Sequence, residues 1–399
     1  MKEISRAALG VKPSSTLAVD TLAKRMIADG LNVINFGVGE PDFDTPENIK
    51  RAAVRAIDGG KTKYTPAAGI DELKKAAAGR LYADCGVTYK PSEIVVASGA
   101  KHSIFVVVSA LTNAGDEAVI PSPYWVTYPE IVKMAGGTPV IVRTEERAGF
   151  KLTAAQLDRA ITPRTKFLIL NNPSNPTGML YSREELLSLA EVCVSRDIYM
   201  ISDEIYYKMV YDGREFVSAA SLGDELKART ILINGVSKSY AMTGWRVGYS
   251  ASSEELARVM GNYLSHSTFA PSTISQYAAA EALSGPQESV ETMRQAFEQR
   301  RNYAVKRVNS IPGISCIMPE GAFYVMINIE KQLGKTLGGR VINGGDDFAL
   351  ALLERGRVAV VSCSGFGDPG FVRMSYAAGM DDIKEGLDRI EKFLSEETE

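Results

Sequence analysis

The chain has 399 residues, enough for two or three domains at a typical size of roughly 150 residues each. Hydrophobic residues make up 45% of the chain and charged residues 23%, a composition that excludes a disordered chain and a coiled-coil rod. The formal net charge of −3 indicates no basic surface for nucleic acid or for an anionic membrane.

Histidine and cysteine usage also excludes some kinds of site. The chain has two histidines, too few for a histidine-rich metal cluster, and its four cysteines form no CxxC pair. We expect reduced thiols, as in cytosolic proteins. The first residues lack a sustained apolar stretch, and the most apolar runs, such as 103–111, are too short to span a bilayer. We therefore expect a cytoplasmic protein with no metal site and no membrane segment.

Short apolar runs bounded by turn residues alternate with helical patterns through the middle of the chain. Such runs are typical of strands buried on both faces. They lie at residues 94–98, 118–120, 139–142, 167–171, 199–202 and 230–234, with helical patterns between them, for example at 124–134 and 183–195. This alternation predicts an α/β fold with a mostly parallel sheet that helices cover on both sides.

The pattern changes near residue 285. We predict a charged helix at 287–308, a strand at 322–329, a helix at 346–355, strands at 358–361 and 371–376, and a last helix at 382–395. These elements indicate a smaller α+β domain, against which we expect the N-terminal residues to pack. The predicted division is a large domain at 48–285 and a small domain formed by 1–47 plus 286–399.

The most informative stretch begins at Asn234 and presents Lys238 just after a predicted strand. An amine between Ser237 and Ser239, without acidic neighbours, suits a Schiff base with an aldehyde, provided that burial or a nearby cation lowers its pKa. Arg246 follows, and its guanidinium has the geometry that binds a phosphate. For Lys238 taken alone, an ordinary surface lysine is the alternative.

Asp203 directly follows another apolar strand, so it lies at the carboxyl end of that strand, where open α/β sheets bind ligands. A pyridoxal ring needs such a carboxylate to keep its ring nitrogen protonated. Tyr206, and Asn175 in the Pro-rich loop 171–178, could each hydrogen-bond the phenolic oxygen of that ring. The alternatives are a helix N-cap for Asp203, core packing for Tyr206 and a plain turn around Asn175.

Three further signals are weaker one by one. Gly99 precedes a helix whose N-terminal N–H groups could hold a phosphate. Trp125 could stack on a planar ring or fill the core. Arg373 lies in an otherwise apolar strand, where it needs an anionic partner, either a substrate carboxylate or an internal ion pair. Together with Lys238 and Asp203, these residues form a set that no other common cofactor requires.

The chain resembles fold-type I pyridoxal-phosphate enzymes, specifically the class I aminotransferases, from Asn35 to Arg373. The most specific matches lie at 172–178, 202–206 and 237–246. The resemblance implies a seven-stranded, mostly parallel sheet, pyridoxal 5'-phosphate as cofactor, amino-acid and 2-keto-acid substrates, and Lys238, Asp203 and Tyr206 as catalytic residues. It implies cofactor contacts from Gly99, Ala100, Lys101, Trp125, Asn175, Asp203, Tyr206, Ser237, Lys238 and Arg246. It implies substrate contacts from Thr16, Gly39, Lys101, Trp125, Asn175 and Arg373.

Tyr64 matches a residue that this family donates to the neighbouring subunit's phosphate, so the resemblance also implies a homodimer with shared active sites. Thr16 and Lys101 match residues that bind the distal carboxylate in bacterial aspartate aminotransferases, in a subgroup that often also accepts prephenate. Phe269 and Ala270 depart from that subgroup's pattern and are expected to reshape the side-chain pocket.

Three alternatives to an aspartate aminotransferase remain open. An aromatic or alanine-type aminotransferase would share the same cofactor residues. A carbon–sulfur β-lyase would share them too, although it has less need for the distal cation of Lys101. A non-catalytic regulator that binds pyridoxal phosphate would usually carry an added helix-turn-helix domain, for which the chain has no spare segment.

Overall fold

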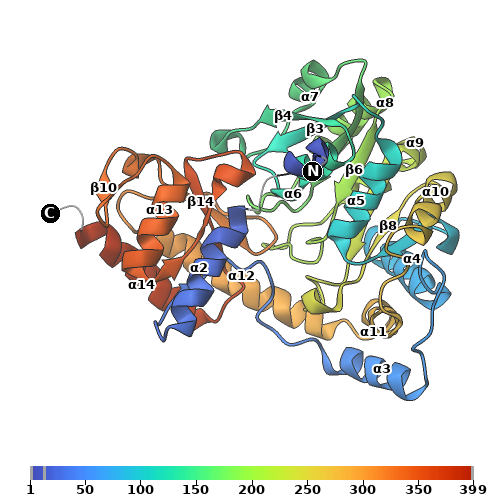
Figure 1. Cartoon of the computed structure of the whole chain (residues 1–399), viewed down its shortest axis with the longest axis horizontal. Coiled ribbons are helices and arrows are strands. Elements are labelled where there is room, and N and C mark those ends of the chain that lie inside the picture. The colour runs from blue at the N-terminus through green and yellow to red at the C-terminus, as the bar shows by residue number, and fades with distance from the viewer. Residues whose placement is uncertain (1–2, 12–14, 397–399) are drawn as a thin grey trace.

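The computed structural model describes residues 3–11 and 15–396, and within them a seven-stranded sheet forms the centre of the molecule (Figure 1). The strand order is β2-β8-β7-β6-β5-β3-β4, and β8 runs opposite to the other six strands. The strands are β2 (Ile94–Ala97), β3 (Glu117–Ser122), β4 (Thr138–Arg143), β5 (Thr165–Asn171), β6 (Tyr199–Asp203), β7 (Thr230–Gly235) and β8 (Gly248–Ala251). The predicted α/β fold with a mostly parallel sheet is confirmed.

The six predicted strands all occur in this sheet, with ends that differ by at most two residues. The sequence analysis missed β8, because four residues that begin with glycine and include a serine form no continuous apolar run. The helix predicted at 124–134 begins later, as α6 (Thr127–Met134). Tyr124 lies instead in a loop, where its backbone N–H donates a hydrogen bond to the backbone oxygen of Phe366.

Helices cover both faces of the sheet, because its strands carry apolar residues on both faces. Helices α5 (Ala100–Leu111), α6 and α10 (Glu254–Ser265) bury one face, and α7 (Ala154–Ala160), α8 (Arg183–Ser195) and α9 (Asp224–Arg229) bury the other. Neighbouring residues of β5 alternate between the two cores: Phe167 and Ile169 pack in the first, Leu168 and Leu170 in the second. A third core lies at the β2 edge, under α3 (Glu47–Asp58), α4 (Asp71–Cys85) and α11 (Thr273–Ser284).

The C-terminal part lies beside this sheet and is drawn in orange and red in Figure 1. Its antiparallel sheet has the order β13-β14-β9, from Val361–Ser362, Phe371–Ser375 and Tyr324–Asn328. Helices α12 (Glu288–Val308), α13 (Gly345–Ala351) and α14 (Met380–Glu396) pack around it, and β10 (Thr336–Leu337) pairs with β11 (Arg340–Val341). The helix predicted at 346–355 ends in a π-helical turn, Leu352–Gly356.

The N-terminal residues pack on this C-terminal part. Strand β1 (Ile34–Asn35) pairs in parallel with β12 (Val358–Ala359), so the strand predicted at 358–361 is two short strands, β12 and β13. Helix α2 (Ser15–Ala28) contacts the same region, and α1 (Arg6–Leu9) precedes it. One apolar cluster joins Val19 and Phe36 to α12 and α14, and it also includes Tyr206 from the segment after β6. The segment that follows β1 is thereby held against the carboxyl ends of the large sheet's strands.

Across residues 3–11 and 15–396, no helix is both long and apolar enough to cross a membrane.

Candidate active site

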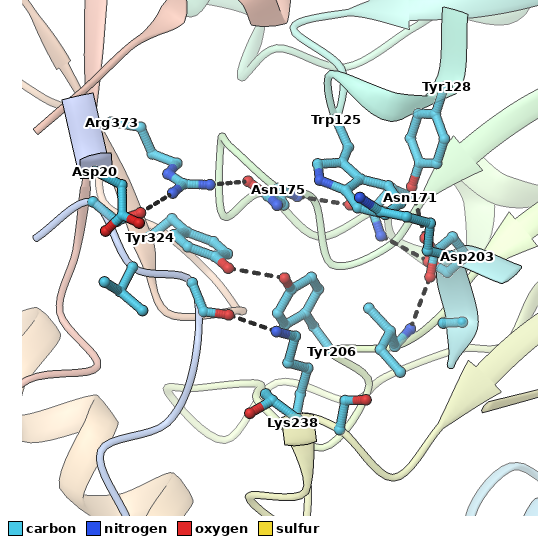
Figure 2. A pocket seen from close by; sticks show the side chains of 18 of the residues that line it. Asp20, Trp125, Tyr128, Asn171, Asn175, Asp203, Tyr206, Lys238, Tyr324 and Arg373 are labelled. Atoms are coloured by element: carbon cyan, nitrogen blue, oxygen red, sulfur yellow. Dashed lines mark hydrogen bonds between the residues drawn. The ribbon is translucent and has the colours of Figure 1, made fainter. Parts of the chain in front are cut away.

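A cavity of about 410 Å³ opens where the carboxyl ends of β5, β6 and β7 face the C-terminal part (Figure 2). The sequence-predicted residues that line it are Gly39, Ala100, Lys101, Trp125, Asn175, Asp203, Tyr206, Ser237, Lys238, Arg246 and Arg373. These residues come from segments far apart in the sequence, and the fold brings them around one space. Most of the predicted site therefore exists as a single pocket.

Lys238 lies in the turn after β7, with its side chain inside the cavity. Its Nζ donates a 2.5 Å hydrogen bond to the backbone oxygen of Gly39. Burial, the largest cause, lowers the pKa of the Lys238 amine to about 8. The charge of Glu40 opposes this shift, and the charges of Arg373 and Arg246 add to it. A larger fraction of this amine is neutral near pH 7 than of an ordinary lysine, which suits a nucleophile or a base.

Asp203 ends β6 and is 2% exposed. Its carboxylate accepts a 2.7 Å hydrogen bond from the hydroxyl of Tyr128 and a 3.2 Å bond from the backbone N–H of Ile205. Burial raises the pKa of Asp203 to about 6, while these hydrogen bonds and the charge of Lys238 lower it. The amide of Asn171 donates to the backbone oxygen of Asp203 at 2.9 Å and fixes the end of the strand. The site holds a buried acid that a cation in the cavity would keep ionised.

Arg373 and Asn175 meet on the opposite side of the cavity (Figure 2). Nη1 of Arg373 donates to Oδ1 of Asn175 at 3.1 Å, and Nη2 donates to the backbone oxygen of Gly37 at 2.8 Å. Arg373 is 4% exposed, and its buried Nε has no partner among the described residues. The sequence analysis left open an internal ion pair for Arg373, but its partners here are neutral oxygens. The guanidinium therefore keeps a charge that an anionic ligand can neutralise.

Gly99, Ala100 and Arg246 form a corner of the site at the N-terminus of α5. The guanidinium of Arg246 donates to the backbone oxygens of Thr243 at 2.8 Å and Ser98 at 3.3 Å. A Cβ placed on Gly99, whose φ is +88°, would lie 2.6 Å from Nη2 of Arg246, so only glycine allows this close approach. Backbone N–H groups of a helix start and a guanidinium are together suited to bind an anion such as a phosphate.

Lys101 and Trp125 lie together at the rim of the cavity. The Lys101 amine lies 5.0 Å from the centre of the Trp125 ring, and the indole packs edge-on against Tyr128. Burial, followed by the charge of Arg246, lowers the pKa of Lys101. The Lys101 amine and the Trp125 ring thus line the same part of the cavity, where both can contact a ligand.

Other predicted residues lie elsewhere. Tyr64 is 95% exposed and contacts the ring of Phe269. A separate surface cavity is lined by Tyr64, Phe269 and Ala270. Within this single chain, Phe269 and Ala270 line that surface cavity and not the cavity of Lys238. Thr16 belongs to α2, but its side chain is outside the part of the chain that the structure describes.

Some residues of the site were missed by the sequence analysis. Tyr128 is three residues after Trp125, a spacing that within the predicted helix at 124–134 could have placed both on the same face. Asn171 pairs in register with Asp203 at the ends of adjacent strands, a relation that strand alignment could have suggested. Tyr324 and Asp20 also line the cavity, but they reach it through contacts between distant segments that no local pattern signals.

The residues that the structure describes include no cluster of three or more His, Cys, Asp or Glu side chains that could hold a metal ion.

Comparison with known proteins shows which family this chain is similar to. The profile of the family described as "Aminotransferase class I and II" matches residues 32–390. The aspartate aminotransferase of Geobacillus stearothermophilus is 48% identical over 392 residues, which cover 98% of this chain and 99% of that one. The aspartate/prephenate aminotransferase of Cereibacter sphaeroides is 49% identical over 388 residues, 96% of this chain and 97% of that one. The crystal structure of the aspartate aminotransferase from Rhizobium meliloti superposes with a TM-score of 0.95 at 42% identity, covering 99% of both chains.

Proposed function

Because this chain belongs to the class I and II aminotransferases, we propose that it is a pyridoxal-phosphate-dependent enzyme that transfers the amino group of aspartate to 2-oxoglutarate. One observation carries the proposal: an amine of lowered pKa, Lys238, shares a cavity with the buried acid Asp203 and the unneutralised cation Arg373. Each group suits one demand of the reaction, namely attack on an aldehyde, support of a ring cation, and capture of a carboxylate.

The residues present fit pyridoxal 5'-phosphate. The corner made by Gly99, Ala100 and Arg246, together with the buried Ser237, would hold its phosphate, and Trp125 would lie against its ring. When bound, the cofactor supplies an aldehyde that condenses with amines and a ring that withdraws electrons from the substrate carbon. Asp203 would hold the charge of the ring nitrogen, and the orphaned Nε of Arg373 leaves a donor for an anionic substrate.

Lys238 performs the proton transfer in this proposal. With the cofactor in place, its Nζ would hold the cofactor covalently and, once free, would move a proton from the substrate Cα to the neighbouring cofactor carbon. A pKa of about 8 lets one amine serve as base and then as acid near neutral pH. The hydroxyl of Tyr206 and the amide nitrogen of Asn175 would hold the phenolic oxygen of the ring, since Oδ1 of Asn175 is engaged by Arg373.

Substrate selectivity depends on how the site binds the two carboxylates of a dicarboxylic amino acid. Arg373, with Gly39 and Asn175 beside it, would bind the α-carboxylate, and Lys101 with Thr16 would bind the distal carboxylate. Relatives that are 42–49% identical carry the name aspartate aminotransferase or aspartate/prephenate aminotransferase, which supports a dicarboxylic donor. We include prephenate as a second acceptor, converted to arogenate.

A panel of amino donors with 2-oxoglutarate, and of prephenate as acceptor with glutamate or aspartate as donor, tests this assignment. We expect aspartate to give the highest kcat/KM and to form oxaloacetate only while the second keto acid is present. Equal or better use of alanine or phenylalanine would reassign the enzyme within its family. Steady release of ammonia and a keto acid from cystathionine without any acceptor would instead indicate a β-lyase.

We also propose a cytoplasmic homodimer in which Tyr64 completes the phosphate site of the other subunit, within the two domains 48–285 and 1–47 plus 286–399. Tyr64 is nearly fully exposed in the single chain, as a residue that serves a partner would be. Mixing Tyr64→Ala and Lys238→Ala subunits tests this. If Tyr64 acts across the interface, mixed dimers regain one intact site and activity rises above that of either variant. If activity does not rise, Tyr64 does not act across the interface.

A further inference from the structure

Tyr324 lies beside Tyr206, Arg373 and Gly39 in the candidate site, and the proposed function assigns it no role. Its hydroxyl oxygen lies 3.0 Å from that of Tyr206. The guanidinium of Arg373 lies 4.4 Å from the centre of its ring, in the range of a cation–π contact. A Cβ placed on Gly39 would lie 2.6 Å from the Tyr324 hydroxyl. Figure 2 shows Tyr324 between Arg373 and Tyr206 at the wall of the cavity.

Burial makes the contact between the two phenols restrictive. Tyr324 is 1% exposed and Tyr206 is 4% exposed, so water does not compete freely for either hydroxyl. Burial raises the pKa of both phenols, so each keeps its single proton. Either oxygen could be the donor in the pair. If Tyr206 donates its proton to a ligand in the cavity, Tyr324 must donate to Tyr206.

We propose that Tyr324 is a positioning residue, an inference that rests on the proposed function. Its hydroxyl donates to the oxygen of Tyr206 and so directs the Tyr206 proton toward the phenolic oxygen of the bound cofactor. Consecutive hydrogen bonds polarise one another, so a donor behind Tyr206 also makes Tyr206 a stronger donor. The stacked guanidinium of Arg373 fixes the Tyr324 ring. Glycine at position 39 is needed because a side chain would press on the Tyr324 hydroxyl.

The test is the colour of the protein loaded with pyridoxal phosphate, titrated with pH. In Tyr324→Phe the phenolic oxygen loses part of its stabilisation and holds the nearest proton more tightly. We expect the midpoint of the visible absorption change to move up by about half a unit to one unit, the worth of one neutral hydrogen bond. Tyr376→Phe is the matched control, because Tyr376 is equally buried but donates to the backbone oxygen of Ala322 at 3.3 Å. It should leave the midpoint unchanged.

A double-mutant cycle separates this role from a general effect on packing. Tyr206→Phe should shift the midpoint further than Tyr324→Phe, and the double variant should match Tyr206→Phe, because Tyr324 acts only through Tyr206. An unshifted midpoint in Tyr324→Phe, or full additivity in the double variant, would overturn the inference while leaving the proposed function intact. If Tyr206→Phe also caused no shift, or the unmodified protein took up no cofactor, the proposed function would fail and this inference with it.

Discussion

The hydroxyl of Tyr128 donates a 2.7 Å hydrogen bond to Oδ2 of Asp203, and both side chains are at least 98% buried. Burial destabilises the ionised form of the carboxylate, so the pKa of Asp203 rises to about 6. The bond from Tyr128 counters part of that rise and also fixes the direction of the carboxylate. The acid is thereby oriented toward the cavity before any ligand arrives.

Replacing Asp203 by Asn should reduce kcat by about 10²–10³-fold, because a neutral amide cannot stabilise the charge that develops in the cavity. Tyr128→Phe should be milder, about tenfold, the worth of one hydrogen bond to a charged group. Since that bond lowers the pKa of Asp203, its loss raises this pKa, and the acidic limb of the pH–rate profile should move to higher pH. Tyr181→Phe is the control, because Tyr181 is also a buried phenol but its hydroxyl accepts a hydrogen bond from the backbone N–H of Leu152 instead of contacting Asp203. An unshifted limb in Tyr128→Phe would refute this link.

The cofactor-free protein should capture pyridoxal phosphate at a rate that rises with pH with a midpoint near pH 8, since only the neutral amine of Lys238 attacks the aldehyde. Arg373→Gln removes a charge that lowers the pKa of this lysine, so its midpoint should lie at higher pH. Stopped-flow absorbance measures the rate at each pH. A midpoint near 10.5, the ordinary lysine value, would mean that the pocket does not tune this amine.

Lys101→Gln should raise KM for aspartate by about tenfold or more, because the distal carboxylate loses a charged hydrogen-bond partner. The KM for alanine, which lacks that carboxylate, should hardly change. Lys133→Gln is the control, because Lys133 lies on nearby α6 but outside the cavity. Equal losses for both substrates in Lys101→Gln would show that Lys101 serves the cofactor rather than selectivity.

Glu204, the neighbour of Asp203, offers a test of stability. It is 1% exposed, and its Oε1 accepts hydrogen bonds from the hydroxyls of Ser202 and Ser218 and from the N–H of Ala219 at 2.9–3.0 Å. Burial raises its pKa from 4.5 to about 7, so the folded state holds the proton more tightly than the unfolded chain. Stability from this group is full below about pH 4.5 and is lost as the pH rises through 7.

Glu204→Gln does not titrate, so its unfolding free energy relative to the unmodified protein should increase by up to about 3 kcal/mol between pH 4.5 and pH 8. Urea unfolding of the cofactor-free proteins at both pH values measures the difference. The exposed Glu255→Gln serves as control and should show no such change. A difference that stays constant with pH would show that folding does not raise the pKa of Glu204.

Local sequence patterns predicted the site residues whose positions depend on where a strand ends. Asp203, Lys238 and Asn175 each follow an apolar strand, and parallel strands bring their carboxyl ends to one edge, so these residues had to lie close together. The same logic also produced the fold class and most strand positions. Strand β8 escaped because its residues, Gly248–Ala251, carry no apolar run.

Contacts between the two parts of the molecule could not be predicted in this way. Gly37 and Gly39 reach Arg373 and Lys238 because β1 pairs with β12, a pairing that only the complete fold defines. Tyr324 was included in a predicted strand, but its phenol meets Tyr206 only across the junction of the two parts. Residues of this kind need the tertiary structure, because their function depends on partners more than a hundred positions away.

The central claim is that the Lys238 amine binds the cofactor covalently. Borohydride reduction of the protein incubated with pyridoxal phosphate, followed by peptide mass spectrometry, tests it most directly. We expect one pyridoxyl group per chain on the peptide that contains Lys238, and none there in Lys238→Ala. A protein that stays colourless and traps no adduct, or an adduct that forms on another lysine, would contradict it.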